Sequence, residues 1–360
     1  MPSASRLTVL HYTGSTWDGS GIHAALRPLA QTSKFRCLLG VSTGFVAEKL
    51  PRLHCWRGPP VRDDRIGPSN LWRTLRVAFR VRRWLRRGSH RVYHGHSRAG
   101  LMVGLWLQFL GAKRVVVSVH VYGRQRWFYR WAAARLGPRL LWQTPAMKRH
   151  YGCRDQDWKG CMPNGLATPR AEAMRRAPAG GVLRLGGAGM LVRLKRWDLI
   201  IEALARLPAG RVVEFSHIGG AVDTEASRAC RADLHALVEL HGLGARVHWL
   251  GWQASSAGLL AQVDAVVVPS DSEAFSMIAL EALFAGVPVI ATRGGGPEDL
   301  IIDGENGWLV PRSDAGALAR RIELCCEIPA WAGLRVEPEH LRRFSTESLA
   351  PQWAAIYASL

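Results

Sequence analysis

The sequence predicts an α/β protein with parallel sheets, built from two domains of similar size. Three observations lead to this prediction. Short β-branched segments alternate with helical segments along the whole chain, which is typical of parallel sheets covered by helices. The 360 residues are enough for two domains that each bury a core. Residues 167–181, rich in Ala, Pro and Arg, have the composition of a linker between the two halves.

The predicted elements follow one another in the same scheme in both halves. In the first half, strands are expected at residues 7–10, 35–39, 91–94 and 114–119, and helices at 22–32, 70–87, 98–110 and 125–136. In the second half, strands are expected at residues 183–188, 211–218, 246–250, 265–268, 287–291 and 307–310. The helices between and after them are expected at 196–206, 224–241, 254–262, 274–285, 314–327 and 345–360.

The N-terminal half carries the positive charge of the chain. Residues 1–170 contain 30 Lys and Arg against 6 Asp and Glu, a net charge of +24. Residues 171–360 contain 18 against 22, a net charge of −4. Such an asymmetry indicates an anionic partner of the first domain: a membrane surface, a nucleic acid or a phosphate-bearing ligand.

The densest basic segment, residues 71–87, is predicted to form a helix with one apolar stripe. The stripe consists of Leu71, Leu75, Ala78 and Leu85. One interpretation is a basic amphipathic helix at an anionic interface, and the other is a surface helix whose stripe packs on the sheet. Both interpretations hold if the apolar stripe faces the core while the arginines and Trp72 or Trp84 contact lipid headgroups.

Cysteine content and hydropathy bear on the compartment. The seven cysteines form no C-x-x-C pair, and their odd number argues against a disulfide framework, so a reducing compartment is the simpler expectation. The apolar stretch at residues 7–10 is too short for the core of a signal peptide. Residues 101–110 are too few to span a bilayer. We therefore expect no part of the chain to span a membrane.

Histidines follow two predicted strands of the first half. His94 ends the predicted strand at 91–94, His96 lies two residues further on, and His120 follows the strand at 114–119. Open parallel sheets bind ligands at the carboxyl ends of their strands, so these residues are candidates for a binding site. The H-x-H spacing can also chelate zinc, which leaves a metal centre as the alternative for this trio. No convincing carboxylate or cysteine lies nearby in the sequence, so we expect no metal.

Two glutamates dominate the second half. Glu273 follows the apolar strand at 265–268 and precedes a helix, and Glu281 lies about two turns further on, on a nearby face. Lys195 lies at a strand-to-helix junction, where helix amides and a cationic side chain can face phosphate oxygens together. Taken alone, Glu273 would be a helix-dipole residue and Lys195 a surface side chain.

The segment from residue 269 to 292 resembles the E-x7-E signature of the retaining GT-B glycosyltransferases of the family 4 type. Further motifs match this family in the expected order: Met162-Pro-Asn-Gly165, Gly189 to Asp198, Gly294-Gly-Gly-Pro-Glu298 and Asp303-Gly-Glu-Asn-Gly307. The resemblance implies two Rossmann-like domains whose parallel sheets face each other across a cleft. Residues 1–170 would bind the acceptor and residues 171–343 the nucleotide sugar, while the C-terminal helix, residues 344–360, would pack back on the first domain.

The resemblance also assigns donor-binding roles. Lys195 would bind the donor diphosphate, Glu273 would hold hydroxyls of the donor sugar, and Glu281 would accept hydrogen bonds from the ribose. The backbone amides at the start of the following helix would contact sugar or phosphate, because the first amides of a helix lack intrahelical partners. These amides belong to Phe275, Ser276 and Met277.

One position departs from the family pattern. Met190 stands where the family usually has an arginine directly after the glycine. Arg193 and Arg293 are the candidates to supply the missing cation at the diphosphate, and the alternative is a weaker activation of the donor.

In the first half, the resemblance points to four residues. Gly21 ends a glycine loop that would let the backbone approach the phosphates. His120 matches the histidine that faces the transferred sugar, and His96 and Arg98 are expected on the acceptor side. The catalytic set would be His120, Lys195 and Glu273.

Together, these features predict a retaining, metal-independent glycosyltransferase. It would move a hexose from a UDP- or GDP-sugar to a lipid-linked or phosphorylated glycan in the synthesis of bacterial cell-surface polysaccharide, such as lipopolysaccharide. We expect a cytoplasmic protein at the inner face of the plasma membrane, bound to an anionic membrane surface, with no cofactor and no nucleic-acid partner. The alternatives are a catalytically inactive sugar- or lipid-binding protein and a nucleotide-sugar epimerase on the same fold. A nucleic-acid-binding protein would explain the charge but not the motifs from Glu273 to Glu298.

Overall fold

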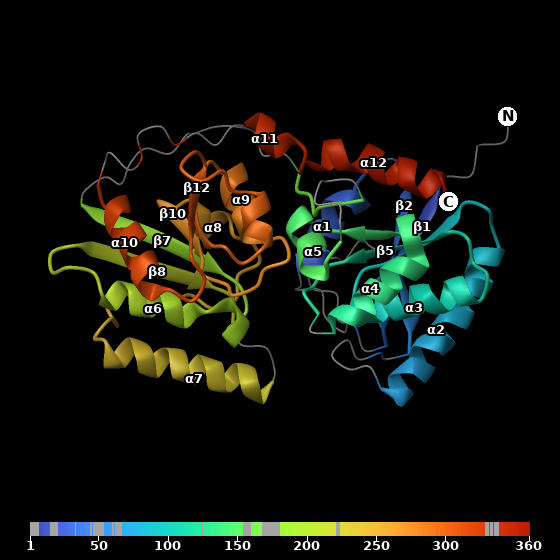
Figure 1. Cartoon of the computed structure of the whole chain (residues 1–360), viewed down its shortest axis with the longest axis horizontal. Helices are drawn as coiled ribbons and strands as arrows, with labels where there is room; N and C mark the ends of the chain where they lie inside the picture. Colours follow the sequence, from blue (N-terminus) through green and yellow to red (C-terminus); the bar gives the residue numbers. More distant parts are fainter. Residues whose placement is uncertain are drawn as a thin grey trace. The chain divides into compact units, whose positions relative to one another are not determined.

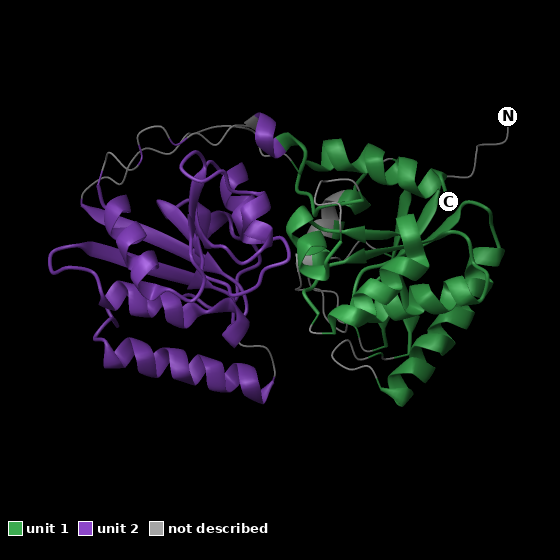
Figure 2. Cartoon of the chain, in the orientation of Figure 1, with its two compact units in different colours: residues 1–168, 342–360 green, residues 169–341 purple. Residues whose placement is uncertain are grey.

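The computed structural model divides into two compact units, traced along the chain in Figure 1 and coloured separately in Figure 2. Residues 1–168 and 342–360 form the N-terminal unit, and residues 169–341 form the C-terminal unit. The structure describes residues 7–14, 21–32, 34–43, 45, 54–59, 61, 67–123, 125–153, 160–167, 181–220, 224–327, 331, 334 and 338–360. Of the predicted linker at 167–181, residues 168–180 lie outside the described residues.

The N-terminal unit contains a parallel sheet of six strands in the order β3-β2-β1-β4-β5-β6. The strands are β1 (Thr8–Tyr12), β2 (Arg36–Ser42), β3 (His54–Gly58), β4 (Arg91–Gly95), β5 (Val115–Val119) and β6 (Leu140–Trp142). The helices are α1 (Gly21–Ala30), α2 (Pro68–Arg86), α3 (Arg98–Phe109), α4 (Arg126–Leu136), α5 (Pro145–Tyr151) and α12 (Thr346–Ala358), with the 3-10 turn η1 (Gly137–Arg139). All five residues of β5 are buried, as expected for a parallel strand that helices cover on both faces.

The C-terminal unit repeats this topology with the strand order β12-β11-β10-β7-β8-β9. The strands are β7 (Val182–Ala188), β8 (Val212–Ile218), β9 (Val247–Trp249), β10 (Ala265–Val268), β11 (Val289–Thr292) and β12 (Gly307–Val310). The helices are α6 (Trp197–Ala205), α7 (Glu225–Leu240), α8 (Ala257–Leu260), α9 (Met277–Phe284) and α10 (Ala315–Cys325), with η2 (Arg193–Lys195) and η3 (Gly296–Asp299); α11 (Pro338–Arg342) follows. Counted from the first strand of each half, both sheets have the doubly wound order 3-2-1-4-5-6. The predicted α/β class with two Rossmann-like sheets is therefore confirmed.

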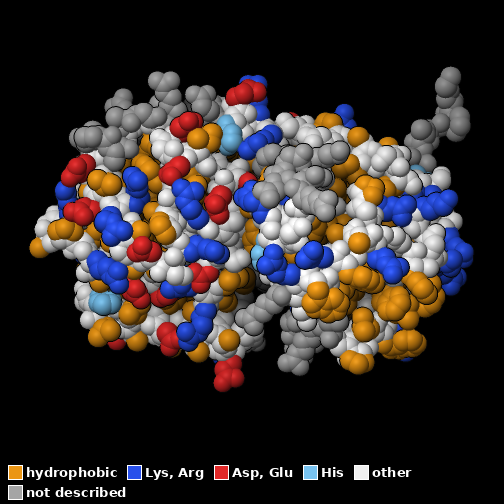
Figure 3. Space-filling model, viewed as in Figure 1, with side chains coloured by type: hydrophobic (Ala, Val, Ile, Leu, Met, Phe, Trp, Pro, Cys, Tyr) orange, Lys and Arg blue, Asp and Glu red, His pale blue; other side chains and the backbone are white. Residues whose placement is uncertain are grey.

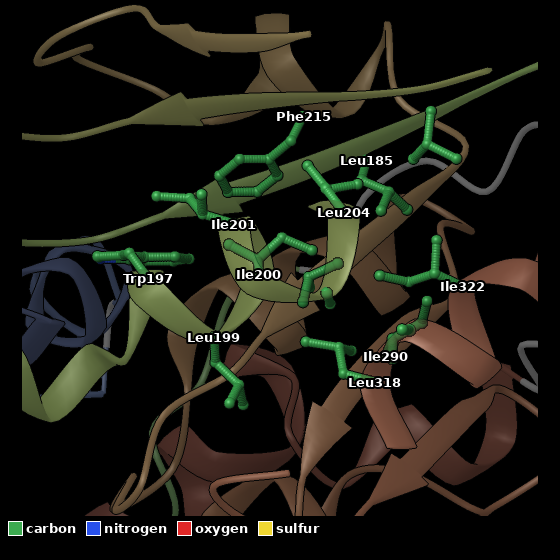
Figure 4. Packing of buried hydrophobic residues seen from close by; sticks show 14 of the residues in the cluster. Leu185, Trp197, Leu199, Ile200, Ile201, Leu204, Phe215, Ile290, Leu318 and Ile322 are labelled. Carbon is green, nitrogen blue, oxygen red and sulfur yellow. The ribbon is translucent and has the colours of Figure 1, made fainter. Parts of the chain in front are cut away.

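The core of the C-terminal unit lies around α6. Ile200, Ile201 and Leu204 of this helix are almost fully buried and belong to the same cluster as Phe215 of β8 and Ile322 of α10. Figure 4 shows these side chains at close range, with α6 next to α10 and the side chains of both helices meeting those of the strands. The packing fixes the position of α6 and of the turn that precedes it, which carries Lys195.

The apolar stripe of α2 differs from the predicted one. The buried residues of the helix are Asn70, Thr74, Val77, Ala78, Val81 and Leu85. Ala78 and Leu85 lie on the predicted stripe, but Leu71 is 37% exposed and Leu75 is only half-buried. Val77 and Val81, which the prediction left out, complete an i, i+4, i+8 row with Leu85 and turn the buried face away from Leu71.

Two further expectations concern the whole chain. All seven cysteines are free thiols, as their odd number and spacing predict. Among the helices that the structure describes, none is long and apolar enough to cross a bilayer.

Candidate active site

Lys195 and Glu273 form an ion pair at the carboxyl ends of the strands in the C-terminal unit. Lys195 ends η2, in the turn after β7, and Glu273 lies in the loop after β10. The two strands are neighbours in the sheet, so their loops emerge side by side. The Lys195 ammonium donates to Glu273 Oε2, and both side chains are largely buried, at 21% and 16% exposure. Ser270 Oγ donates to the same carboxylate oxygen at 3.2 Å.

A second set of contacts holds these two loops together. The backbone amide of Asp271 donates to the Leu194 carbonyl oxygen at 3.1 Å. Arg196, the residue after Lys195, donates to the carboxylates of Asp271 and Asp198 at 3.0 to 3.2 Å and to Ser313 Oγ at 2.8 Å. Its hydrogen bonds to Asp198 raise the pKa of Arg196, so the guanidinium is firmly cationic. Hydrogen bonds on both sides of the Lys195–Glu273 pair therefore hold the loop after β7 against the loop after β10.

The triglycine segment packs directly against Glu273. The Glu273 amide donates to the Gly294 carbonyl at 2.9 Å, and the Gly296 amide donates to the Glu273 carbonyl at 2.7 Å. A Cβ at Gly296 would lie 2.5 Å from backbone atoms of Ala274 and Phe275, so only glycine permits this approach. Glu298 accepts a hydrogen bond from the Gly295 amide at 3.0 Å, which closes the segment on itself.

The loop after Glu273 leads into the short helix α9. Phe275 is buried, at 2% exposure, and Ser276 has a positive φ of 72° while its hydroxyl caps the helix at Ala279. Met277 is the first residue of α9. About one turn further along α9, Glu281 accepts a hydrogen bond from Ser256 Oγ at 2.6 Å. Ser270 and Ser256 are therefore polar neighbours of Glu273 and Glu281. The sequence motif predicted the two glutamates but not these two serines.

The two candidates to replace the missing arginine at Met190 have other partners. Arg193 donates to Asp233 of α7 at 2.9 Å, and its side chain is 82% exposed. Arg293 pairs with Asp303 at 3.2 Å. Met190 itself is 44% exposed, and its carbonyl accepts from the Trp197 indole at 3.0 Å. Lys195 is therefore the cation that the structure places against Glu273.

The turn that contains Met190 crosses the turn after β8 at very short range. Gly219 has φ +120°, and a Cβ there would lie 2.0 Å from the Gly189 carbonyl oxygen. The Leu191 amide donates to the Gly220 carbonyl at 3.0 Å, and the Gly219 amide to the Gly251 carbonyl at 2.8 Å. The absence of a side chain at Gly219 thus allows the turn after β7, which precedes Lys195, to lie directly against the turn after β8.

His217, at the end of β8, was not singled out from the sequence. It is 1% exposed and packs edge-on against Trp197 with ring centroids 4.5 Å apart. Burial, and secondarily the charge of Lys195, lowers its pKa to about 3, so the imidazole is neutral. Within the described part of the chain, neither of its ring nitrogens has a hydrogen-bond partner.

In the N-terminal unit, His96 and His120 meet at the carboxyl ends of β4 and β5. His96 Nδ1 and His120 Nε2 are 2.9 Å apart. Gln143 Nε2 lies 2.8 Å from His120 Nδ1 and donates to Asn164 Oδ1 at 3.0 Å. These four residues line one small pocket of about 20 Å³. Burial lowers the pKa of His120 to about 3, and burial together with the other histidines lowers that of His96 well below 6.5.

His94 turns away from His120. Its Nδ1 lies 2.7 Å from the Tyr357 hydroxyl of α12, and its Nε2 lies 2.8 Å from Ser118 Oγ. The three histidines whose ring nitrogens come within 4.8 Å of one another are His11, His94 and His96, whereas the sequence offered His94, His96 and His120 as the alternative metal site. This group could hold a metal ion, but it contains no anionic ligand to offset the charge of a divalent cation in a buried site.

The remaining predicted residues of this unit are Arg98 and Gly21. Arg98 is the first residue of α3, and its Nε donates to the Tyr129 hydroxyl of α4 at 3.3 Å. Gly21 is the first residue of α1, and residues 15–20, which include most of the predicted glycine loop, lie outside the described residues.

The lysine and glutamate at adjacent strand ends, and the glycine segment against them, lie in a stretch of sequence that matches a known family. Residues 185–344 match the Glycosyl transferases group 1 family. The matched segment contains Lys195, Glu273, Glu281 and the triglycine segment. The match supports the resemblance that the motifs indicate.

Similar proteins extend the likeness beyond this segment. The chain is 34% identical over 233 residues to the lipopolysaccharide core biosynthesis glycosyltransferase LpsE of Rhizobium meliloti (strain 1021), covering 61% of this chain and 64% of LpsE. It thus spans slightly less than two thirds of the length of that relative. It is 29% identical over 312 residues to the D-inositol 3-phosphate glycosyltransferase of Arthrobacter sp. (strain FB24), covering 77% of this chain and 72% of the other.

Solved structures show the fold. Anabaena Alr3699/HepE in complex with UDP superposes with a TM-score of 0.78 at 20% identity, covering 98% of this chain and 100% of that one. The apo form of the lipopolysaccharide outer core galactosyltransferase WaaB superposes with a TM-score of 0.69 at 18% identity, covering 98% and 100%. Together with the two sheets described above, these neighbours confirm the predicted GT-B class.

Proposed function

We propose that this protein is a retaining glycosyltransferase of family 4 that transfers a hexose from a UDP- or GDP-sugar to a lipid-linked or phosphorylated glycan of the bacterial cell surface. The observation that carries the proposal is the Lys195–Glu273 pair within the glycosyltransferase domain. The likeness to LpsE, named for lipopolysaccharide core biosynthesis, and to HepE, solved with UDP, supports the acceptor class and the donor class.

Transfer of a sugar from a nucleotide creates negative charge on the departing diphosphate and positive charge at the sugar carbon. In this proposal Lys195 stabilises the diphosphate, and the amides at the start of α9 assist it. Glu273 orients the sugar through its hydroxyls, and Glu281 holds the ribose. Because Lys195 and Glu273 contact each other in this structure, a donor diphosphate competes with the carboxylate for the ammonium. Donor binding is therefore expected to separate the pair.

We further propose that the reaction requires no metal ion. Lys195 supplies the positive charge that a divalent cation supplies in other transferases. Burial keeps four histidines of the N-terminal unit neutral, and they are hydrogen-bonded to one another and to Gln143, Ser118 and Tyr357: His11, His94, His96 and His120. Such contacts satisfy these rings without an ion.

The proposal is tested by a nucleotide-release assay with a panel of UDP- and GDP-sugars and a bacterial membrane extract as acceptor. Release from one donor would establish transfer and name the sugar, and the anomeric configuration of the product, read by NMR, would show retention or inversion. The assay is repeated in EDTA, where unchanged release supports metal independence. No release from any donor, together with no calorimetric binding of UDP or GDP, would contradict the proposal.

Such a negative result would favour the second candidate, a catalytically inactive sugar- or lipid-binding protein. The observation behind it is that Met190 replaces an arginine while Arg193 and Arg293 have other partners. Reversible conversion of the donor sugar without an acceptor would instead indicate an epimerase.

We propose that the acceptor domain works on an anionic membrane surface, at the inner face of the plasma membrane. Six large apolar side chains of the N-terminal unit are exposed on α2, α3 and α4: Leu71, Trp72, Phe79, Phe109, Trp127 and Trp131. Figure 3 shows hydrophobic side chains gathered on one face of this unit, with Lys and Arg side chains near them. The guanidinium of Arg76 stacks on Trp72 and that of Arg135 on Trp131. Aromatic rings beside arginines are typical of surfaces that enter the headgroup layer.

A basic pocket lies at the C-terminal end of α2. Its volume is about 240 Å³, and four of its lining residues are cations: Arg82, Arg86, Lys113 and Arg114. Arg82 and Arg114 are held in place by backbone carbonyls of Leu110 and Leu85 at 2.9 and 3.1 Å. A lipid phosphate in this pocket would meet these cations.

Charge reversal on α2 is expected to abolish binding to anionic vesicles. Replacing Arg82, Arg83, Arg86 and Arg87 with glutamate should weaken binding to phosphatidylglycerol vesicles at least a hundred-fold, because each arginine near such a surface contributes about 1 kcal/mol. Binding is measured by vesicle sedimentation at two salt concentrations. A matched control reverses Arg228 and Arg231 on α7 of the C-terminal unit, and it should leave binding unchanged. Equal binding of the α2 variant and the wild type would contradict the membrane proposal.

A further inference from the structure

A continuous row of hydrogen bonds runs through the N-terminal unit behind His120. Gln143 Nε2 lies 2.8 Å from His120 Nδ1, and His120 Nε2 lies 2.9 Å from His96 Nδ1. His96 Nε2 lies 2.9 Å from His11 Nδ1, and His11 Nε2 lies 3.5 Å from Cys37 Sγ. His11 and Cys37 lie on β1 and β2, His96 and His120 directly follow β4 and β5, and Gln143 directly follows β6, so no two of them are neighbours in the sequence.

The two ends of the row give the same direction of proton donation. At one end the Gln143 amide nitrogen can only donate, so His120 Nδ1 accepts and the single proton of the neutral ring lies on Nε2. At the other end the Cys37 thiol lies 3.8 Å from the Leu29 carbonyl oxygen, which can only accept. With the thiol proton on the Leu29 carbonyl, the sulfur can accept from His11 Nε2, which agrees with the direction at the Gln143 end. The second argument does not depend on how any side-chain amide is oriented.

Between these ends, each histidine has one donor and one acceptor, as a neutral imidazole requires. His120 donates from Nε2 to His96, His96 donates from Nε2 to His11, and His11 donates from Nε2 to Cys37. Burial lowers the pKa of His11 to about 3 and keeps the other two rings neutral as well. A protonated ring anywhere in the row would place two N–H groups against each other.

We propose that Gln143 is a positioning residue that fixes His120 as the neutral Nε2–H tautomer, through a directional relay formed by His120, His96, His11 and Cys37. His120 then offers an N–H donor from Nε2, while its one acceptor nitrogen is occupied by Gln143. A sugar hydroxyl can compete with His96 for that donor, but His120 cannot act as a base at Nδ1. The expected effect on turnover rests on the proposed transferase function. The tautomers of the three histidines do not depend on that function.

The relay makes a specific prediction for Gln143→Glu, which keeps the shape of the side chain and replaces the donor by an acceptor. His120 must then carry its proton on Nδ1, so His120 Nε2 accepts from His96 Nδ1, and His96 Nε2 accepts from His11 Nδ1. One substitution is therefore expected to reverse the tautomers of three histidines. Protonation states are read from ¹⁵N shifts of the ring nitrogens in long-range ¹H–¹⁵N spectra of the full chain, with each ring assigned by single substitutions.

Two further variants separate the ends of the row. Gln143→Met removes the donor without adding an acceptor, so we expect His120 to keep the Nε2–H form if the Cys37 end is intact. Cys37→Ala removes the other end, so Gln143 alone should hold His120 and His96 in the same form. His217, which lies in the C-terminal unit, serves as the internal reference and should not change in any variant. If Gln143→Glu does not fold, the double variant Gln143→Met with Cys37→Ala takes its place, and mixed tautomers at His120 are expected.

The relay is wrong if wild-type His120, His96 or His11 carries its proton on Nδ1, or if Gln143→Glu changes His120 alone. It is also wrong if the purified protein contains one equivalent of a metal ion whose removal alters the spectra of His11, His94 and His96. Where turnover is detected, Gln143→Glu should lower kcat at least ten-fold with little change in the KM of the nucleotide sugar. The reason is that the His120 ring then carries its proton on Nδ1 and no longer offers an N–H group from Nε2 to the sugar. Absence of turnover in the wild type would refute the transferase proposal while leaving the tautomer result intact.

Discussion

Replacing Lys195 with alanine is expected to lower nucleotide release at least a hundred-fold. In the proposed function the ammonium stabilises the charge that develops on the leaving diphosphate, and removal of one such group typically costs two to three orders of magnitude in rate. The loss should appear mainly in kcat, because the charge grows in the transition state. Steady-state release of the nucleotide from the active donor measures it. Glu273→Gln, which preserves shape but removes the charge that faces Lys195, should show a loss of the same order.

The control for this experiment lies two residues away. Arg193 carries the same charge in the same turn, but it is 82% exposed and pairs with Asp233. Arg193→Ala is therefore expected to retain most of the activity, since exposed ion pairs contribute little. If Arg193→Ala were as inactive as Lys195→Ala, Arg193 rather than Lys195 would be the substitute for the arginine missing at Met190.

Gly219→Ala is expected to destabilise the C-terminal unit by about 3 kcal/mol, through backbone strain and overpacking together. Its φ of +120° is unfavourable for alanine, and the new Cβ would meet the Gly189 carbonyl at 2.0 Å. The turn after β7 must then move, and Met190 to Lys195 move with it. A fall of roughly 10 °C in Tm should result for a unit of this size, and donor binding should weaken.

The adjacent glycine provides the comparison. Nothing lies within 4 Å of a Cβ built at Gly220, and its φ is not in the left-handed range. Gly220→Ala should therefore leave Tm within about 1 °C of the wild type. Thermal unfolding of the two variants, followed by circular dichroism, tests the close crossing of the two turns. Equal Tm values for both would mean that the turn after β7 adapts without cost.

The central strands could be predicted because their composition reflects burial on both faces. The central strand at 265–268 was predicted with its observed bounds, and so was the edge strand at 307–310, where three of the four residues are buried. The edge strands β3 and β6 were missed. β3 contains His54 and Arg57 and is only partly buried, and β6 is three residues long, so neither forms a β-branched apolar run. Their pairing depends on a neighbouring strand, which local sequence does not reveal.

Some residues of the candidate site could likewise be predicted from the sequence, and others could not. Lys195, Glu273 and Glu281 could be singled out because they lie at fixed distances from strand and helix signals. Their partners, Ser270 and Ser256, carry no such signal, because common serines in loops become informative only when the loops meet. The row from Gln143 to Cys37 was beyond reach for the same reason: its hydrogen bonds join residues up to 85 positions apart.

The neutral histidines have a consequence for acid stability. His11, His94, His96 and His120 in the N-terminal unit, and His217 in the C-terminal unit, all have pKa values far below 6.5, chiefly because of burial. A ring whose pKa is lower in the folded than in the unfolded state stabilises the fold above pH 6.5, and this contribution is lost as the pH falls toward the folded pKa. Below pH 6.5, unfolding takes up about four protons at these rings in the first unit and one in the second, so stability falls by roughly 5 and 1.4 kcal/mol per pH unit. Mild acid should therefore unfold the basic N-terminal unit while the C-terminal unit remains folded.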